Sequence, residues 1–273
     1  MNVEIQIFNI GRTMVDREQV RLWLNWLNVN QYEIPGEDVV SDPALLVALA
    51  AKRCYMSFEP GLNPNVTKIR SSMVDYLDNI LASGHGSVLE HAVYSFAIEG
   101  VSRVFTGEMN RHRAGWAISE GSMRFIRFDR DIPWWMPMSL RGEKEDDIDL
   151  SLRKSVSQEI FKKAFNQMKE NYSELLKVWD MEEGHHNFRY KKRVTSCLRR
   201  IIGMGVATGG VWTGNIRALR HVIALRGDEA SAEEEIFHVF SRVGKIMFEK
   251  EGMMFRDFKQ DERGSWVPGY RKV

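Results

Sequence analysis

Apolar residues recur along the chain with two different spacings. Val3, Ile5 and Ile7 occupy every second position and predict a short strand, whereas residues 16–29 carry apolar side chains at helical spacing. The clearest strand signal is HAVYSFAIEG, residues 91–100, where β-branched and aromatic residues alternate with other types. The pattern therefore predicts both strands and helices.

Helical spacing covers most of the remaining chain. One helix begins at a capping Asp42 with Pro43 in its first turn, and another covers residues 66–82 and ends at Gly84. A continuation of the central strand into a helix is expected over 101–113. In the second half we expect a long amphipathic helix from Ser151 to Trp179, with further helices near 187–201, 214–226 and 231–250.

Segments without this spacing suggest how one catalytic domain, residues 1–273, is arranged. Residues 1–40 are expected to form an N-terminal extension, and residues 254–273 an exposed tail. Residues 129–150 combine prolines, tryptophans and an acidic run. We expect a lid or insertion with a solvated second half, and a plain surface connection is the alternative.

Composition narrows the class of protein. A chain of 273 residues with 44% hydrophobic and 27% charged residues is typical of a large globular domain, which excludes disordered and fibrous classes. The net charge of +1 provides no overall basic field, so nucleic acid and anionic membranes are disfavoured as partners.

Cysteine usage and apolar runs indicate the compartment. Cys54 and Cys197 are too few for a disulfide framework or a four-cysteine zinc site. Glu4 interrupts the first apolar stretch, which disfavours a signal peptide, and the longest apolar run, 201–212, is about half of the roughly 20 residues that span a membrane. We expect a cytoplasmic protein without a membrane segment.

The first polar cluster is SGHGSVLEH, residues 83–91. His85, Ser87 and Glu90 lie between a helix end and a strand, where they could converge on an anion or a polar ring system. The spacing of His85 and His91 differs from that of a helical zinc pair, so no metal site is expected.

The second cluster, residues 111–124, is rich in arginine. Arg111, His112, Arg113 and Arg124 suit forked hydrogen bonds to phosphate oxygens, and the alternative is a basic surface loop. Ser122 could be a nucleophile, but no general base lies at an evident spacing, and donation to phosphate is the simpler interpretation.

The third cluster is NIRALRHVIALR, residues 215–226. On a helix, Arg217 and His221 share one face, while Asn215 and Arg226 fall near the apolar face. The arginines fit either the wall of a site or a solvated basic face, and the spacing alone does not decide between them.

Together these clusters resemble the flavin-dependent thymidylate synthase family. The run GHGSVLEHAVYSFAIEGVSRVFTGEMNRHR matches the family's segment that ends in Arg-His-Arg, and Glu120, Ser122 and Arg124 match its Glu-x-Ser-x-Arg. WTGNIRALRHVIALR resembles the family's later helix, and Arg199 precedes Asn215 by sixteen residues, as the family's phosphate arginine does. The likeness spans roughly 44–128 and 190–250.

The resemblance implies an α/β fold of the α+β type, with a central antiparallel sheet flanked by helices, in a homotetramer whose sites are shared between subunits. It implies FAD-dependent C5 methylation of dUMP to dTMP, with methylenetetrahydrofolate and NADPH as co-substrates. By position, the cofactor would be bound by His85, Ser87, Glu90, Arg111, His112, Arg113, Glu120, Asn215, Arg217 and His221. The nucleotide would be bound by Glu108, Glu120, Gly121, Ser122, Met123, Arg124, Arg199 and Arg226.

Arg226 is the catalytic candidate, because a guanidinium near the uracil ring can stabilise the negative charge that develops during attack by C5. Three departures from the family pattern keep other functions open: Glu108 replaces a usual Gln, His221 replaces a usual Asn, and the spacer after Arg113 is longer. The alternatives are C5 methylation or hydroxymethylation of UMP or dCMP, and a non-enzymatic nucleotide or RNA binder.

Overall fold

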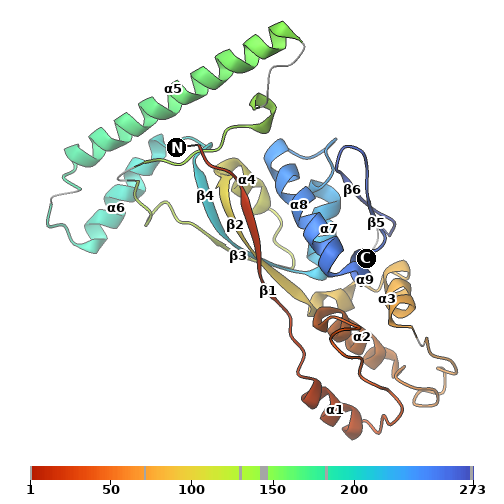
Figure 1. Ribbon diagram of the computed structural model, residues 1–273. Coiled ribbons are helices and arrows are strands. Elements are labelled where there is room, and N and C mark those ends of the chain that lie inside the picture. The colour runs from red at the N-terminus through yellow and green to blue at the C-terminus, as the bar shows by residue number, and fades with distance from the viewer. Residues whose placement is uncertain (1, 71, 129–130, 142–146, 182–183, 271–272) are drawn as a thin grey trace.

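The centre of the fold is a four-stranded antiparallel sheet in the order β1-β2-β4-β3 (Figure 1). The computed structural model describes residues 2–70, 72–128, 131–141, 147–181, 184–270 and 273. The strands of this sheet are β1 Gln6–Arg12, β2 Val93–Ser102, β3 Trp116–Glu120 and β4 Ala207–Asn215. Helices flank the sheet, which confirms the fold class implied by the resemblance.

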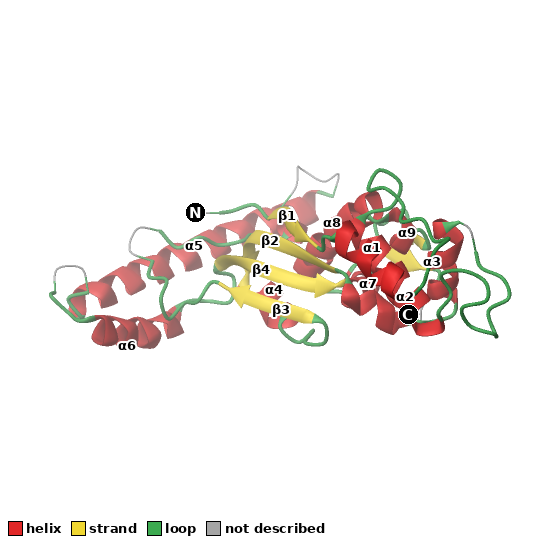
Figure 2. Ribbon diagram, turned by 90° about the horizontal axis from the view of Figure 1, so that it is seen from below, coloured by secondary structure: helices red, strands yellow, loops and turns green. Residues whose placement is uncertain are grey.

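Most helices lie at one end of the sheet, whereas α5 and α6 lie beyond its other end (Figure 2). The helices are α1 Arg17–Trp26, α2 Asp42–Tyr55, α3 Met73–Ala82, α4 Arg103–Met109, α5 Ile148–Val178, α6 Phe188–Leu198, α7 Ile216–Arg226, α8 Glu234–Lys250 and α9 Gly252–Phe255. Short 3-10 helices are η1 Gly86–His91, η2 Met138–Leu140 and η3 Arg199–Ile201, and a hairpin of β5 Phe258–Gln260 and β6 Trp266–Pro268 closes the chain.

Alternate side chains of β2 are buried in the main core. Phe96 and Ile98 are buried on one face of the sheet, and Phe96 pairs with Trp212 of β4. The ring of Trp212 meets Phe105 of α4 edge-on, with ring centroids 5.7 Å apart. On the opposite face of the sheet Phe8 is 52% exposed, so a single chain covers only one face.

A second, smaller core joins α5 to α6. Tyr172 and Leu176 of α5 pack with Val194 and Leu198 of α6. The long helix predicted over 151–179 is confirmed. Its apolar side is buried only in the C-terminal half, because Ile160 in the first half is 63% exposed.

Three predicted element starts are wrong, and pairing or capping explains each. The first strand begins at Gln6 rather than Val3, because its pairing with β2 begins at Gln6. Ser41 rather than Asp42 caps α2, since the Ser41 hydroxyl accepts the Ala44 N–H. The helix predicted from residue 66 begins at Met73, where Ser72 provides the cap.

The exposed tail predicted for residues 254–273 is also wrong. Phe255, Phe258 and Trp266 are buried at 1%, 3% and 5% exposure. The indole N–H of Trp266 donates to the Ser241 carbonyl of α8 at 2.8 Å. The apolar side chains therefore fold this segment back onto the main core.

The segment 129–150 lies partly outside the described residues. Among its described residues, 131–141 and 147–150, the side chains of Ile132, Trp134 and Trp135 are buried, whereas residues 147–150 are exposed. Trp134 also forms backbone bridges with Asn2 and Val206. No helix of the described residues is long and apolar enough to cross a membrane.

Candidate functional site

Helix α7 and two segments beside it carry most residues expected to bind the cofactor. Asn215 caps the helix, and its side-chain oxygen accepts the Ala218 N–H at 2.8 Å. Leu219 and Ile223 are fully buried and fix the helix against the core. Arg217 and His221 are thereby held on the other side of the helix, facing two neighbouring segments.

The first of these segments is η1. Arg217 forms an ion pair with Glu90 at 2.7 Å. The backbone of Gly86 passes so close to Arg217 that an added Cβ would lie 2.8 Å from its Nε. His85 stacks on Tyr55 at 5.9 Å between ring centroids, and the side chain of Ser87 is exposed. Glycine at 86 thus allows the predicted cluster His85, Ser87 and Glu90 to lie beside α7.

The second segment is the Arg-His-Arg turn after α4. The ring of His112 lies 6.4 Å from that of His221, and the Asn215 N–H donates to the Gly115 carbonyl at 3.0 Å. Arg111 and Arg113 are exposed, and neither forms an ion pair with any residue that the structure describes. The turn therefore presents two guanidinium groups beside the helix.

Arg226 ends α7 between two partners. Its Nη1 lies 3.0 Å from Oε2 of Glu108, and both side chains are about three-quarters buried. Its Nε–H donates to Nε2 of His112 at 3.0 Å. His112 is therefore neutral in this arrangement, with its hydrogen on Nδ1. Burial, followed by the charges of Arg226 and His221, lowers the pKa of His112.

The lowered pKa of His112 predicts a loss of stability in mild acid. As the pH falls below 6.5, the ordinary value, the unfolded chain takes up a proton before the folded chain does. Stability therefore declines, and the contact with Arg226 breaks as the pH passes through the lowered pKa. Thermal unfolding of the wild type and His112→Gln between about pH 5 and pH 7 should show a smaller slope in the variant, which keeps a neutral acceptor. Equal slopes would contradict this assignment.

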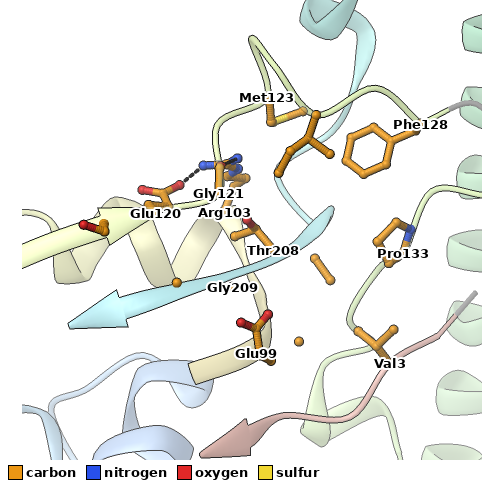
Figure 3. Close-up of a pocket in the computed structure, with 15 residues that line it drawn as sticks. Val3, Glu99, Arg103, Glu120, Gly121, Met123, Phe128, Pro133, Thr208 and Gly209 are labelled. Atoms are coloured by element: carbon orange, nitrogen blue, oxygen red, sulfur yellow. Dashed lines mark hydrogen bonds and ion pairs between the residues drawn. The ribbon is translucent and has the colours of Figure 1, made fainter. Parts of the chain in front are cut away.

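A different cavity collects the residues expected to bind the nucleotide. Glu120, Gly121, Ser122, Met123 and Arg199 line an open cavity of about 560 Å³ beside α4. It adjoins a second cavity of about 570 Å³, which lies over the sheet between Glu99, Thr208 and Pro133 (Figure 3). The two cavities share Arg103, Glu120, Gly121 and Met123.

Arg103 is the site residue that the sequence reasoning missed. Its guanidinium forms an ion pair with Glu120 and donates to the Gly121 carbonyl at 2.6 Å (Figure 3). Asn110 donates to the second oxygen of Glu120 at 2.8 Å. Burial, and then the charge of Arg199, lowers the pKa of Arg103. The available signal was its place directly after a buried strand, at the first position of a helix.

Within one chain the three key arginines lie in different surroundings. Arg199 lines the cavity beside α4, Arg124 lines a groove on α6 that shares Arg200 with this cavity, and Arg226 lies with Glu108 at the end of α7. Ser122 accepts the Arg124 N–H at 3.4 Å, and no histidine in the described part of the chain hydrogen bonds to its hydroxyl. In the described residues, no histidine is therefore placed to act as a general base for Ser122.

Possible metal ligands are not gathered at one place in the described residues. They contain no group of three His, Cys, Asp or Glu side chains placed to hold a metal ion. Cys54 and Cys197 are both free and exposed, and neither lines the two cavities beside Arg103. The side chains that line these cavities offer anion binding by arginines and hydrogen bonding by Glu120 and Ser122.

Comparison with known proteins identifies the family. Residues 38–250 match the family model described as "Thymidylate synthase complementing protein". A flavin-dependent thymidylate synthase from Mycobacterium bovis (strain BCG / Pasteur 1173P2) is 34% identical over 194 residues, which cover 70% of each chain. One from Corynebacterium diphtheriae is 29% identical over 225 residues and covers 82% of each chain.

A solved structure shares the fold. The UMP/dUMP methylase PolB from Streptomyces cacaoi, bound with 5-Br dUMP, aligns with a TM-score of 0.61 at 15% sequence identity, covering 92% of this chain and 93% of its own. The matches extend over η1, the Arg-His-Arg turn and α7, the elements that build the candidate site. The chain therefore belongs to the flavin-dependent thymidylate synthase family.

Proposed function

We propose that this enzyme uses FAD to methylate C5 of dUMP, giving dTMP, with methylenetetrahydrofolate as carbon donor and NADPH as reductant. The observation that carries the proposal is the cavity lined by Ser122, Met123 and Arg199, because it combines hydrogen-bond donors for a phosphate with an apolar side chain for a base. Relatives at about 30% identity are named flavin-dependent thymidylate synthase.

The described residues fit a flavin nucleotide. Arg111 and Arg113 form no ion pair within the described part of the chain and suit its two phosphates. Gly86 and Gly115 let η1 and the Arg-His-Arg turn pack closely on α7, which brings the expected cofactor residues together. Arg217, Asn215 and His221 offer further hydrogen bonds from α7. When bound, the flavin would supply two electrons as hydride. The chain's own task is to orient the ligands and to exclude water.

The roles of the arginines follow from their surroundings. Arg199 and the Ser122 hydroxyl would bind the nucleotide phosphate, joined by Arg124. Arg226 has two of its nitrogens engaged by His112 and Glu108, which leaves Nη2 to face a uracil carbonyl and stabilise developing negative charge. Since one chain holds Arg199 and Arg226 apart, we propose that they meet across subunits of a homotetramer.

UMP is the alternative substrate that a specific observation favours. Glu108 places a carboxylate beside Arg226, and a carboxylate accepts a hydrogen bond from a sugar hydroxyl. Only a ribonucleotide carries the 2′-hydroxyl. The structural neighbour PolB is described as a UMP/dUMP methylase, and solved complexes contain 5-Br dUMP and 5-Br UMP.

A nucleotide panel tests the function and the role of Glu108 together. Flavin-loaded enzyme is given methylenetetrahydrofolate, NADPH and dUMP, UMP or dCMP, and mass spectrometry distinguishes methyl from hydroxymethyl products. We expect dTMP from dUMP. If Glu108 reads the 2′-hydroxyl, Glu108→Gln lowers turnover of UMP relative to dUMP by about tenfold, the scale of one hydrogen bond to a charged group.

Two results would count against these assignments. A protein that binds no flavin, or that gives no product from dUMP, would overturn the proposed reaction. An unchanged ratio of UMP to dUMP turnover in Glu108→Gln would remove Glu108 from sugar recognition and leave the reaction itself standing.

A further inference from the structure

The outer face of α6 carries a groove, called here the basic groove, that the proposed reaction does not use in full. It has a volume of about 490 Å³ and is lined by Arg124, Arg189, Lys192, Arg193, Ser196, Cys197 and Arg200. The opposite face of the helix, with Val194 and Leu198, packs on α5. The fold of this region therefore depends on the apolar face and not on the cations.

Within the described residues, no carboxylate balances the positive charge of the basic groove. No carboxylate lines it, and Arg124, Arg189, Lys192 and Arg193 form no ion pair within the described part of the chain. Arg200 donates to the Ser196 carbonyl at 2.8 Å instead. Like charges held on one concave surface repel, so a ligand that carries several negative charges would relieve the repulsion.

The position of Arg189 in α6 is unfavourable for helix stability. It lies in the first turn of α6, after the capping Asn187, and that turn contains no acidic residue. The N-terminal end of a helix carries partial positive charge and is stabilised by Asp or Glu, not by Arg. A cation at this position is better explained by a ligand than by stability.

Aromatic rings border the same groove. Phe125 and Phe188 stack at 6.2 Å between ring centroids, although they are 55% and 70% exposed. Lys192 Nζ lies 4.6 Å from the Phe125 ring centroid. This contact holds the ammonium group at the groove rather than in open solvent.

The basic groove leads away from the nucleotide cavity. Arg200 lines both, and Ser122 in the cavity is two residues from Arg124 in the groove. Arg189, Arg193 and Ser196 follow successive turns of one face of α6, about 5.4 Å apart, and Arg200 continues the row in η3. A linear chain of carboxylates matches this arrangement, whereas the single phosphate of a mononucleotide needs only two or three of these groups.

We propose that the basic groove binds the oligo-γ-glutamate tail of the folate co-substrate. The inference rests on the proposed function, because that function supplies the folate. Each γ-linked glutamate adds one carboxylate, which is ionised at neutral pH. The tail would leave the reaction cavity past Arg200 and extend along Arg193 and Arg189.

The test uses a fluorescently labelled γ-linked hexaglutamate and needs no turnover. Its affinity for the wild-type enzyme should fall as salt rises, since its contacts are charge pairs. The double variant Arg189→Glu/Arg193→Glu should bind it about tenfold more weakly, equivalent to about 1.4 kcal/mol. Lys191→Glu is the control for a single charge reversal and is compared with Arg193→Glu alone, because both make the same charge change on α6 but Lys191 does not line the groove. Lys191→Glu should bind nearly as the wild type does.

A stability measurement separates binding from folding. Arg189→Glu places an acid in the first turn of α6, so its unfolding temperature should not fall below that of the wild type. In turnover assays, the double variant should raise the KM of pentaglutamyl methylenetetrahydrofolate and leave the KM of the monoglutamyl form and kcat unchanged. The proposal is overturned if Arg193→Glu and Lys191→Glu bind hexaglutamate equally.

Further outcomes distinguish this inference from the proposed function. Inorganic triphosphate or a short RNA binding more tightly than hexaglutamate would assign the basic groove to phosphate or nucleic acid and overturn the folate proposal. Equal KM values for mono- and pentaglutamyl folate in the wild type would do the same, with the methylation reaction intact. If hexaglutamate binds at the groove but dUMP is not methylated, the reaction fails while the polyanion site is supported.

Discussion

Replacing Arg226 by alanine is expected to lower turnover by at least roughly a hundredfold, the scale of losing one positioned electrostatic stabiliser. The guanidinium is three-quarters buried and is oriented by Glu108 and His112, so little reorganisation is needed when charge develops on the uracil ring. Flavin absorbance should remain, because Arg111, Arg113 and the N-terminal part of α7 would hold the cofactor. Single-turnover oxidation of the reduced enzyme measures the effect.

Two further variants make the result specific. Arg226→Lys keeps the charge but loses the planar fork, and it should recover only part of the rate. Arg263→Ala removes an arginine whose side chain is 74% exposed, and it should leave turnover unchanged. Thermal unfolding of Arg226→Ala shows whether the unpaired Glu108 destabilises the fold. Wild-type turnover in folded Arg226→Ala would exclude Arg226 from the reaction.

Replacing Arg199 by alanine should act on binding instead. Arg199 lines the cavity with Ser122 and Met123, and the loss of one charge-assisted hydrogen bond to phosphate weakens binding by roughly 10- to 100-fold. We expect the KM of dUMP to rise on that scale with a much smaller change in kcat. The charge of Arg199 also lowers the pKa of Arg103. Its removal favours the charged form of Arg103, so the ion pair of Arg103 with Glu120 should persist in the variant.

The comparison that checks this expectation is the binding of nucleoside and nucleotide. Deoxyuridine lacks the phosphate, so its affinity should be the same for the wild type and Arg199→Ala. Arg256→Ala, at an ion pair of 3.7 Å far from the cavity lining, is the charge control. A variant that binds dUMP as tightly as the wild type would show that Arg199 does not contact phosphate.

The sequence was sufficient to predict those helices and strands whose hydrophobic pattern lies within one segment. Alternation in residues 91–100 predicted β2, since a strand between a core and an open face repeats every second residue. Helical spacing likewise predicted α5, α7 and α8. Asn215 was expected at the site, and the structure adds that it caps α7 and so fixes Arg217 and His221.

Other features depended on partners that are distant in the sequence. The position of residues 254–273 at the end of the chain predicted an exposed tail, yet the Trp266 side chain donates a hydrogen bond to α8. Arg103 showed no motif, and only the return of β3 brings Glu120 and Gly121 to its guanidinium. Long-range pairs of this kind have no spacing rule along the chain.

The sequence by itself determined the family, the helical and strand periods, and the arginine-rich turns that suit phosphate. The tertiary structure alone decided which of these groups meet: Glu108 with Arg226 and His112, Arg103 with Glu120, and Arg124 with the cations of α6. The physical reason is that backbone and side-chain periodicity are local. Electrostatic partners, in contrast, are brought together by packing around the core, and the interaction between exposed charges is largely screened beyond about 10 Å. Arg199 and Arg226 show this most clearly. Both belong to one family pattern in the sequence, yet in the single chain Arg199 lines the cavity beside α4 and Arg226 pairs with Glu108.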